Sequence, residues 1–364
     1  MKGLGADLTV NPDASIRRAM ACIDRNTRGI ALVLDEERHL IGTITDGDIR
    51  RAILTGLNLD VPVTELLSRK SESLYPKPIT ASAEADADQL LRLMQEHRIR
   101  QIPILDSDDR VVDLVMMEDL LPDQGLPLQA VIMAGGYGKR LRPLTESLPK
   151  PMLPVGDRPL LERTIDQLRR AGIKRVQVST GYLREKITDY FGDGRDFGVE
   201  LRYVTEDQPL GTAGALGLLE EPDEPLLVIN GDILTQVDYR AMLDFHHHHQ
   251  ADMTVAARQY DLRVPYGVVE TDGVRITGIV EKPTVQNFIN AGIYLLSPVV
   301  HRYIPSAQRC DMPDLIRRLI EEGCLVVCFP VREYWIDIGE VKDYRRALED
   351  VNNGKFAERQ GVGV

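Results

Sequence analysis

The sequence predicts an α/β protein in two parts, a repeated α+β region followed by a larger domain with a mostly parallel sheet. Three observations predict this. The chain of 364 residues exceeds the usual size of a single hydrophobic core. Residues 1–121 repeat themselves at a constant spacing. From residue 128 onward, short apolar runs alternate with amphipathic segments, which is typical of parallel strands joined by crossover helices.

The N-terminal region contains one internal repeat. The segment LDEERHLIGTITDGDI, which begins at Leu34, matches LDSDDRVVDLVMMEDL, which begins at Leu105, and the two are 71 residues apart. Internal repetition indicates two copies of one supersecondary unit. We expect the copies, at about 1–65 and 72–121, each to contain an approach segment, a helix, two short strands and a closing helix.

This repeat resembles a tandem pair of CBS (cystathionine-β-synthase) domains, which fold together and bind adenosine nucleotides in clefts between them. In the first copy, Gly42, Thr45 and Asp48 match the family's ribose-binding pattern, and a hydroxyl and a carboxylate three residues apart can both reach sugar hydroxyls. In the second copy, Asp113 and Met116 replace the glycine and the threonine. We therefore expect at most one site for AMP, ADP or ATP, held by Thr45 and Asp48. The alternative is that these two residues only cap the following helix.

Residues 122–127, PDQGLP, combine proline, glycine and charge, which predicts a linker. The second domain is expected over residues 128–355, and residues 356–364 are expected to be a frayed tail.

The second domain opens with residues 128–155, LQAVIMAGGYGKRLRPLTESLPKPMLPV. A short apolar run predicts a buried strand that leads into a glycine loop. The loop glycines are Gly135, Gly136 and Gly138. Without Cβ atoms, they let several backbone N–H groups approach an anion, and Arg140 and Lys150 add positive charge that suits phosphate oxygens. The stretch predicts a triphosphate cradle, and its spacing fits neither a P-loop nor a dinucleotide fingerprint.

An alternation of helices and strands follows the loop. The predicted order is helix 160–171, strand 175–180, helix 183–191, strand 200–205, helix 212–219 and strand 226–229. Sheets of this kind bind their ligands at the carboxyl ends of the strands.

The opening string resembles the signature of the sugar-1-phosphate nucleotidylyltransferases (the nucleotide-sugar pyrophosphorylases), which is close to GGxGxRLxPLTxxxPKPMLPV. The resemblance extends from about Leu128 to Lys355 and implies a Rossmann-like, three-layer nucleotide-diphospho-sugar transferase domain. It also implies that Gly211 and Thr212, in the turn PLGTAG, contact the nucleobase. The alternative is that Thr212 caps a helix after a tight turn.

A metal site is predicted at two distant aspartates. Asp232 follows a buried strand, and a carboxylate that faces a triphosphate needs a cation between them; Mg²⁺ is the natural choice because it prefers oxygen ligands. The resemblance makes Asp232 one metal ligand and Asp337, in WIDIG, the second. A lone aspartate after a strand is more often a turn residue, so this prediction depends on the surrounding motifs.

The sugar phosphate is expected at a hairpin. Asp272 and Gly273 lie between two strand-like segments, which is a strong hairpin signal, and the hairpin leads into the motif EKP. By resemblance, Lys282 binds the sugar phosphate and Glu281 the sugar hydroxyls. The resemblance adds three further sugar contacts, which are Gly267, Asn290 and Gly292. The alternative is an ordinary Glu-Lys pair on the surface.

Together these features predict Mg²⁺-dependent transfer of a nucleoside monophosphate from a nucleoside triphosphate to a sugar 1-phosphate, with Arg140, Lys150 and Lys282 as catalytic residues. The PLGTAGAL form and the CBS pair resemble those of enzymes that make GDP-sugars for surface polysaccharides. GTP and a mannose-1-phosphate guanylyltransferase-like activity are therefore favoured, while UTP, dTTP and CTP remain open as the nucleotide.

Two other functions are alternatives. One is a metal-dependent glycosyltransferase, although residues 232–234 lack the usual Asp-x-Asp. The other is a nucleotide-sensing regulatory protein whose catalytic domain has decayed.

Composition limits the partners and the location. The net charge of −12 argues against nucleic acid and anionic membranes, which need a basic face. The sequence shows no membrane-length apolar stretch and no signal peptide, so a cytoplasmic location is expected. The four cysteines have no zinc or redox spacing, and the run His246 to His249 is not expected to bind metal.

We expect the CBS pair to regulate the enzyme or to join subunits of a homo-oligomer.

Overall fold

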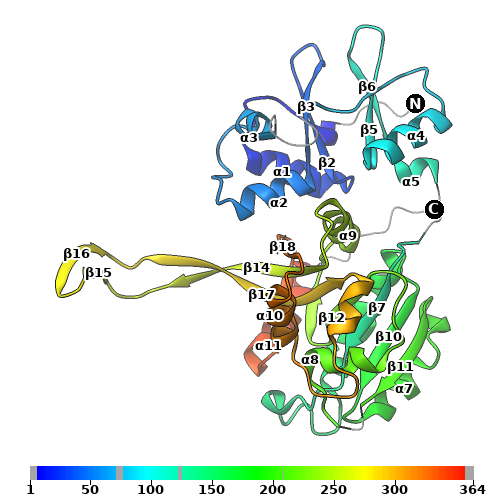
Figure 1. Ribbon diagram of the computed structural model, residues 1–364, viewed down its shortest axis with the longest axis vertical. Helices are drawn as coiled ribbons and strands as arrows, with labels where there is room; N and C mark the ends of the chain where they lie inside the picture. Colours follow the sequence, from blue (N-terminus) through cyan, green and yellow to red (C-terminus); the bar gives the residue numbers. More distant parts are fainter. Residues whose placement is uncertain (1–5, 71–76, 122–124, 207, 357–364) are drawn as a thin grey trace. The chain divides into compact units, whose positions relative to one another are not determined.

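The computed structural model of the protein describes residues 6–70, 77–121, 125–206 and 208–356, and it divides into two units, Met1–Gln124 and Gly125–Val364 (Figure 1). The boundary lies within the predicted linker, although residues 122–124 of that linker are outside the described residues. Residues 357–364 of the predicted tail are also outside them. Phe356 was predicted to be frayed, but it is buried, with its ring 5.5 Å from that of Tyr334.

The first unit is built from two copies of one motif. The corresponding elements are α1 (Ile16–Asn26) and α4 (Ala87–His97), β2 (Ile30–Leu34) and β5 (Gln101–Leu105), β3 (Leu40–Thr45) and β6 (Val111–Met116), and α2 (Asp46–Leu54) and α5 (Met117–Leu120). In every pair, the second element begins 71 residues after the first. The predicted repeat is therefore confirmed at the level of single elements.

Each copy forms its own three-stranded sheet. The strand orders are β1-β2-β3 and β4-β5-β6, where β1 is Thr9–Val10 and β4 is Ala81–Ser82, and α3 (Val63–Lys70) is added to the first copy. Strand β2 is buried along its whole length, as its sequence IALVL requires. Leu32 of β2 and Leu114 of β6 belong to one hydrophobic cluster, so the two copies share part of their core.

The second unit is organised on a seven-stranded sheet. Its strand order is β11 (Glu200–Thr205), β10 (Arg175–Thr180), β7 (Gln129–Met133), β12 (Leu226–Asn230), β17 (Thr284–Leu296), β14 (Met253–Arg263) and β18 (Val326–Val331). Strand β17 pairs antiparallel with β12 and β14, and the four other pairings are parallel. The prediction of a mostly parallel sheet is confirmed.

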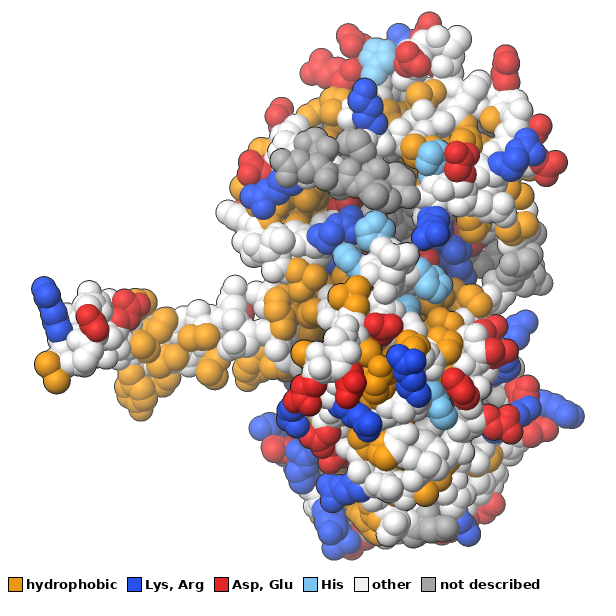
Figure 2. All heavy atoms as spheres, in the orientation of Figure 1, with side chains coloured by type: hydrophobic (Ala, Val, Ile, Leu, Met, Phe, Trp, Pro, Cys, Tyr) orange, Lys and Arg blue, Asp and Glu red, His pale blue; other side chains and the backbone are white. Residues whose placement is uncertain are grey.

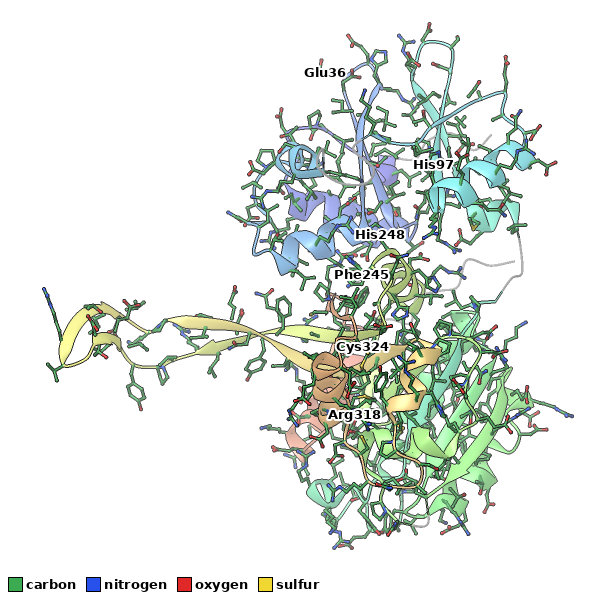
Figure 3. The ribbon with its side chains drawn as sticks, in the orientation of Figure 1. Glu36, His97, Phe245, His248, Arg318 and Cys324 are labelled. Carbon is green, nitrogen blue, oxygen red and sulfur yellow. The ribbon has the colours of Figure 1, made fainter. Side chains whose placement is uncertain are left out.

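Helices cover both faces of this sheet. Helices α6 (Leu160–Arg170), α7 (Arg184–Phe191) and α9 (Tyr239–His248) share a cluster with alternate strand residues such as Ala130 and Ile132. Val131, between those two residues, belongs to the cluster of the opposite face with α8 (Gly211–Gly214) and α10 (Met312–Glu321). Phe245, which Figure 3 labels on α9, contacts Phe329 of β18, with the ring centroids 5.4 Å apart. The domain therefore has three layers.

A smaller substructure closes the unit at its C-terminal end. Strand β13 (Ile233–Thr235) pairs antiparallel with β19 (Trp335–Asp337), and β8 (Pro154–Val155) pairs with β9 (Arg158–Pro159). Helix α11 (Val341–Asn352) packs through Tyr344 and Ala347 into a cluster that includes Ile336 and Leu141. This packing fixes the end of β19 beside the loop that follows β7.

A long two-stranded arm extends from the sheet. Strands β14 and β17 pair as far as Arg263 and Thr284, and the ribbon continues as β15 (Val268–Asp272) and β16 (Arg275–Val280). Figure 1 shows this ribbon projecting away from the rest of its unit, and Figure 2 shows hydrophobic side chains along it. We call residues 259–288 the arm. The predicted Asp-Gly hairpin is confirmed, with Gly273 in the left-handed region at φ +59°.

His246 is a core residue. Its side chain is 2% exposed, with Nδ1 2.8 Å from the Thr254 hydroxyl and Nε2 2.9 Å from the Ser297 hydroxyl.

The four cysteines are free thiols. In the parts of the chain that the structure describes, no helix is long and apolar enough to cross a membrane.

Candidate functional site

The two predicted metal ligands lie at the ends of neighbouring strands, with Asp232 just before β13 and Asp337 at the end of β19. Asp232 follows β12 directly after Gly231, whose N–H donates to the Met133 carbonyl at the end of β7 (2.9 Å). Asp337 is the last residue of β19, and the N–H of Ile338 donates to the Asp232 carbonyl (2.9 Å). The antiparallel pairing of β13 with β19 thus brings two distant aspartates to the carboxyl ends of the parallel strands.

Two cations lie beside these aspartates. The Lys150 ammonium is 2.5 Å from Oδ2 of Asp232, and only 12% and 26% of the two side chains are exposed. A Cβ placed on Gly339 would lie 3.6 Å from Oδ1 of Asp337 and 3.7 Å from Nη1 of Arg140, so the guanidinium approaches the second aspartate. Arg140 also borders an open hollow of about 400 Å³ formed with the start of α11.

The donor set of this site suits a hard divalent cation. Burial raises the pKa of Asp337, the Asp232 carboxylate raises it further, and Lys150 and Arg140 only partly oppose the rise. A raised carboxyl pKa means that the negative charge in this position lacks full compensation. Carboxylate oxygens are ligands that Mg²⁺ prefers. The residues present therefore fit such an ion.

The glycine loop passes over the same end of the sheet. Gly138 has φ +60°, and a Cβ there would lie 3.0 Å from Cγ2 of Thr145 and 3.2 Å from Cβ of Lys150, so a larger residue would displace the lysine. The Thr145 hydroxyl donates to the Gly138 carbonyl (2.8 Å), which holds the loop in place. A Cβ on Gly136 would have no neighbour within 4 Å, so this part of the loop faces open space. The structure therefore brings the loop, Lys150 and Asp232 together.

The turn predicted to contact the nucleobase is tied to α10. The Thr212 hydroxyl accepts from the Met312 N–H (2.7 Å), and the Thr212 N–H donates to Oδ1 of Asp311 (3.2 Å). Thr212 therefore satisfies a donor at the start of α10 and does not cap its own helix, so the alternative reading was wrong. Gly211 has φ +83°, and a Cβ there would lie 2.5 Å from Oδ1 of Asp311. The base-binding role of both residues stays a prediction.

Sequence reasoning missed two polar residues at this edge. Glu206, just after β11, accepts from the Ser179 hydroxyl through Oε1 and from the Leu210 N–H through Oε2 (2.9 Å). Asn230 ends β12, and its Oδ1 is buried with no hydrogen-bond partner in the described part of the chain. The available signal was their position, because each is a polar residue at the carboxyl end of a parallel strand.

The predicted sugar-binding residues are divided between two places. Asn290 and Gly292 are on β17 in the body of the domain, where a Cβ on Gly292 would lie 2.7 Å from Nδ2 of Asn230. Gly267, Glu281 and Lys282 are on the arm, where a Cβ on Gly267 would lie 2.9 Å from Oε2 of Glu281.

The arm does not deliver its charged residues to the aspartates of the same chain. The side chains of Glu281 and Lys282 are 71% and 58% exposed. The ladder from Ala257 to Arg263 covers about 20 Å at the usual rise per strand residue, and Lys282 lies beyond it. In this structure the β14–β17 pairing therefore carries Glu281 and Lys282 away from the body of their own unit (Figure 1), and their role in sugar-phosphate binding stays a prediction.

The predicted nucleotide site of the CBS pair is already filled by a side chain. Thr45 and Asp48 form a capping box at the start of α2, and Asp48 is 4% exposed. Its carboxylate accepts from Lys70 (2.9 Å) and Arg51 (2.5 Å). Burial alone would raise the pKa of Asp48, but these two cations outweigh burial and the pKa is lowered.

Helix α3 also covers the glycine of this pattern. A Cβ on Gly42 would lie 2.7 Å from Cδ1 of Leu67, and the Lys70 ammonium donates to the Thr43 carbonyl (3.1 Å). A cavity of about 170 Å³ remains next to these groups. It is lined by Ile41, Gly42, Thr43, Thr64, Leu67, Lys70 and Pro78.

A three-layer α/β domain with a glycine loop, two cations and two aspartates at the carboxyl edge of its sheet defines a protein suited to handling nucleotide phosphates. Residues 129–354 match the nucleotidyl transferase family, and residues 6–55 and 72–122 match the CBS domain. The chain belongs to the nucleotidyl transferase family and carries a tandem CBS pair.

Curated relatives support this membership. The chain is 34% identical over 258 residues to a UTP–glucose-1-phosphate uridylyltransferase of Synechocystis sp., covering 65% of this chain and 66% of that protein. It is 35% identical over 227 residues to a mannose-1-phosphate guanyltransferase of Candida albicans, covering 60% and 62%. The chain therefore spans a little under two thirds of the length of these relatives.

A solved structure supports the fold. A crystal structure of a Bacillus anthracis protein assigned as a glucose-1-phosphate thymidylyltransferase superposes with a TM-score of 0.52 at 27% identity, covering 64% of this chain and 98% of that one.

Proposed function

We propose that this protein transfers a nucleoside monophosphate from a nucleoside triphosphate to a sugar 1-phosphate and releases pyrophosphate. The observation that carries the proposal is the convergence of Asp232, Asp337, Lys150 and Arg140 beside the glycine loop. The family membership and the names of the relatives support the same reaction.

The chain's contribution is positioning and charge compensation. The phosphate oxygen of a sugar 1-phosphate is already ionised at neutral pH, so it needs no general base to attack the α-phosphorus. Gly135, Gly136 and Gly138 leave room for phosphates near the loop backbone, while Arg140 and Lys150 compensate charge that develops as pyrophosphate leaves. When bound, Mg²⁺ supplies charge neutralisation at the phosphates. Asp232 and Asp337 would hold it.

The ion pair between Lys150 and Asp232 has a mechanistic consequence. A lysine at 2.5 Å from a metal-binding carboxylate competes with the cation for the same oxygen. With a cation held by Asp232, the Lys150 ammonium would be free to pair with an oxygen of the triphosphate. Lys150 would then exchange one ionic contact for another, and no buried charge would be left unpaired.

We further propose GTP as the nucleotide and a mannose-type sugar 1-phosphate as the acceptor. Relatives named as mannose-1-phosphate guanyltransferases, including those of Candida albicans and Mycobacterium tuberculosis, support this choice at 35% identity. The uridylyltransferase relative keeps UTP and glucose 1-phosphate as the second candidate pair.

One experiment tests the reaction and its specificity. GTP, UTP, dTTP and CTP are each combined with mannose, glucose, glucosamine and heptose 1-phosphates in the presence of Mg²⁺, and pyrophosphate release is followed. We expect the highest rate with GTP and mannose 1-phosphate. Asp232→Asn should lower the rate on the order of 100-fold or more, because one oxygen ligand loses its charge. The control is Asp223→Asn, which changes an exposed aspartate and should leave the rate unchanged.

Failure of this experiment has a defined meaning. If the wild-type chain releases no pyrophosphate with any pair, yet binds nucleotides, the domain is a nucleotide sensor and not an enzyme. If Asp232→Asn is fully active, the metal assignment is wrong.

We propose that the CBS pair regulates this reaction through Lys70. An adenosine nucleotide can use Thr45 and Asp48 only when the Lys70 ammonium leaves the carboxylate. Pyrophosphate release with and without AMP, ADP or ATP tests this role, and equal rates and equal molecular mass under all conditions would contradict it.

A further inference from the structure

The arm exposes more apolar surface than a soluble monomer usually leaves uncovered. Among the described residues, twenty large hydrophobic side chains are exposed, and eleven of them lie between residues 260 and 288. Their exposed fractions range from 38% for Val268 to 105% for Val274, with Tyr266 at 74%. With ordinary side-chain areas this amounts to on the order of 1,000 Å² per chain, summed over both faces of the arm, whereas the largest single apolar patch of a typical monomer is about 300–600 Å².

The inner half of the arm has one apolar face and one mostly polar face. Residues that are directly opposite in an antiparallel ladder point to the same side. Leu262 is opposite Val285, and Tyr260, two residues before Leu262, shares their face with its own partner Asn287, which is the one polar residue among these four. The other face carries Gln259, Asp261, Arg263, Thr284 and Gln286, together with Phe288. An amphipathic ribbon of this kind needs a surface to cover its apolar face, because a lone two-stranded ribbon is at best marginally stable.

The arm carries the predicted sugar-phosphate residues, which the body of the domain lacks. Under the proposed function, the sugar phosphate needs Lys282 and Glu281, and both lie beyond the outer end of the β14–β17 ladder. Pairing in that ladder is continuous from Ala257 to Arg263, and the single register shift lies at the sheet edge, between Val255 and Ala257. Within the described residues, each chain therefore has an edge with the two aspartates and no sugar-phosphate lysine, and an arm with the lysine and no aspartates.

We propose that two copies of this chain exchange arms, so that Glu281 and Lys282 of one copy complete the active site of the other. The exchange covers the apolar face of each arm and completes each site. Arm and body contact each other in the same way in both copies, as a two-fold assembly requires. The exposed apolar area of two arms, on the order of 2,000 Å² over both of their faces, exceeds the roughly 1,200 Å² at which stable interfaces begin, so burying little more than half of it suffices. This inference rests on the proposed function.

Complementation between two inactive chains tests the exchange. Asp232→Asn removes a metal ligand from the body, and Lys282→Ala removes the lysine from the arm. The two variants are co-expressed with different affinity tags, and assemblies that carry both tags are isolated and assayed for pyrophosphate release. In a mixed dimer, one site combines an intact body with an intact arm, so we expect about half of the wild-type rate, although each variant alone is inactive.

The other outcomes are equally informative. Doubly tagged assemblies without activity show that each arm serves its own chain, and this would overturn the exchange. A wild-type chain that is active while its measured mass is that of a monomer would overturn it too. If the wild-type chain is inactive, or if Lys282→Ala alone keeps full activity, the proposed function or its lysine assignment has failed, which is a separate result.

A surface variant tests the apolar face independently of catalysis. Leu262→Glu places a charge on the apolar face and should reduce the recovery of doubly tagged assemblies at least tenfold. Gln259→Glu places the same charge on the polar face of the same strand and should leave the recovery unchanged. Equal recovery with both variants would show that the arm does not join the copies.

Discussion

Acidification should destabilise the second unit through His246. The Ser297 hydroxyl donates to the Ala251 carbonyl (2.8 Å), so its oxygen must accept the proton of Nε2 of His246. Nδ1 of His246 is then the acceptor for the Thr254 hydroxyl (2.8 Å). This network fixes a neutral imidazole with its proton on Nε2. A second proton, on Nδ1, would displace the Thr254 hydroxyl that donates to this nitrogen.

The size of the effect follows from the pKa. Burial, with a smaller contribution from His247, lowers the pKa of His246 from 6.5 to about 4, and Asp252 only partly opposes this. In the unfolded chain the residue titrates near its ordinary pKa, so between pH 6.5 and 4 the unfolded state binds more protons than the folded state. The stabilisation from neutral His246 is complete above pH 6.5 and is lost as the pH falls toward 4. At about 1.4 kcal/mol per pKa unit, the loss is roughly 3 kcal/mol.

Urea unfolding at a series of pH values measures this loss. Trp335, the single tryptophan, lies on β19, so its fluorescence reports on the second unit. We expect the unfolding free energy of the wild-type chain to fall more steeply between pH 6.5 and 4 than that of His246→Gln. His39→Gln, which changes a half-buried histidine of the first unit, serves as the control and should follow the wild type when the second unit is monitored. Parallel curves for wild type and His246→Gln would refute the reasoning.

Three further predictions concern the two sites. Gly138→Ala should lower the free energy of unfolding by about 1–2 kcal/mol, because φ is +60° there and the new Cβ would press on Lys150. It should also lower pyrophosphate release, and a stable, fully active variant would contradict the packing. Lys70→Met should strengthen AMP binding at least tenfold in calorimetry, because the Asp48 carboxylate loses its contact with the Lys70 ammonium. Unchanged affinity would show that Lys70 does not compete with AMP for Asp48. Emission from Trp335 should change when Mg²⁺ and GTP are added, and a constant spectrum would place the ligands elsewhere.

Much of the fold could be predicted from local pattern. The strand predicted at residues 175–180 has these bounds in the structure, because its alternation and the preceding glycine define it. The helix predicted at 212–219 is instead a short helix, Gly211–Gly214, followed by the 3-10 helix Ala215–Leu218. The reason is tertiary packing, since a Cβ on Gly217 would lie 2.4 Å from the Pro305 carbonyl.

The site was predicted less completely than the fold. The resemblance identified Asp232 and Asp337, and the strand pairing places them together. Lys70 could not have been foreseen beside Asp48, because its contact depends on where α3 packs and not on any motif. The Asp-Gly signal identified the hairpin near Lys282, but the direction of the arm is set by the β14–β17 ladder, which local sequence does not encode.

The late position of Asp337 in the chain has a consequence during synthesis. The first unit has its own hydrophobic clusters and can fold while the ribosome is still making the second. The candidate cation site, in contrast, cannot form until translation has passed Asp337 and β19 has paired with β13, long after the glycine loop has emerged. A nascent chain thus displays a folded CBS pair well before Asp232 and Asp337 can meet.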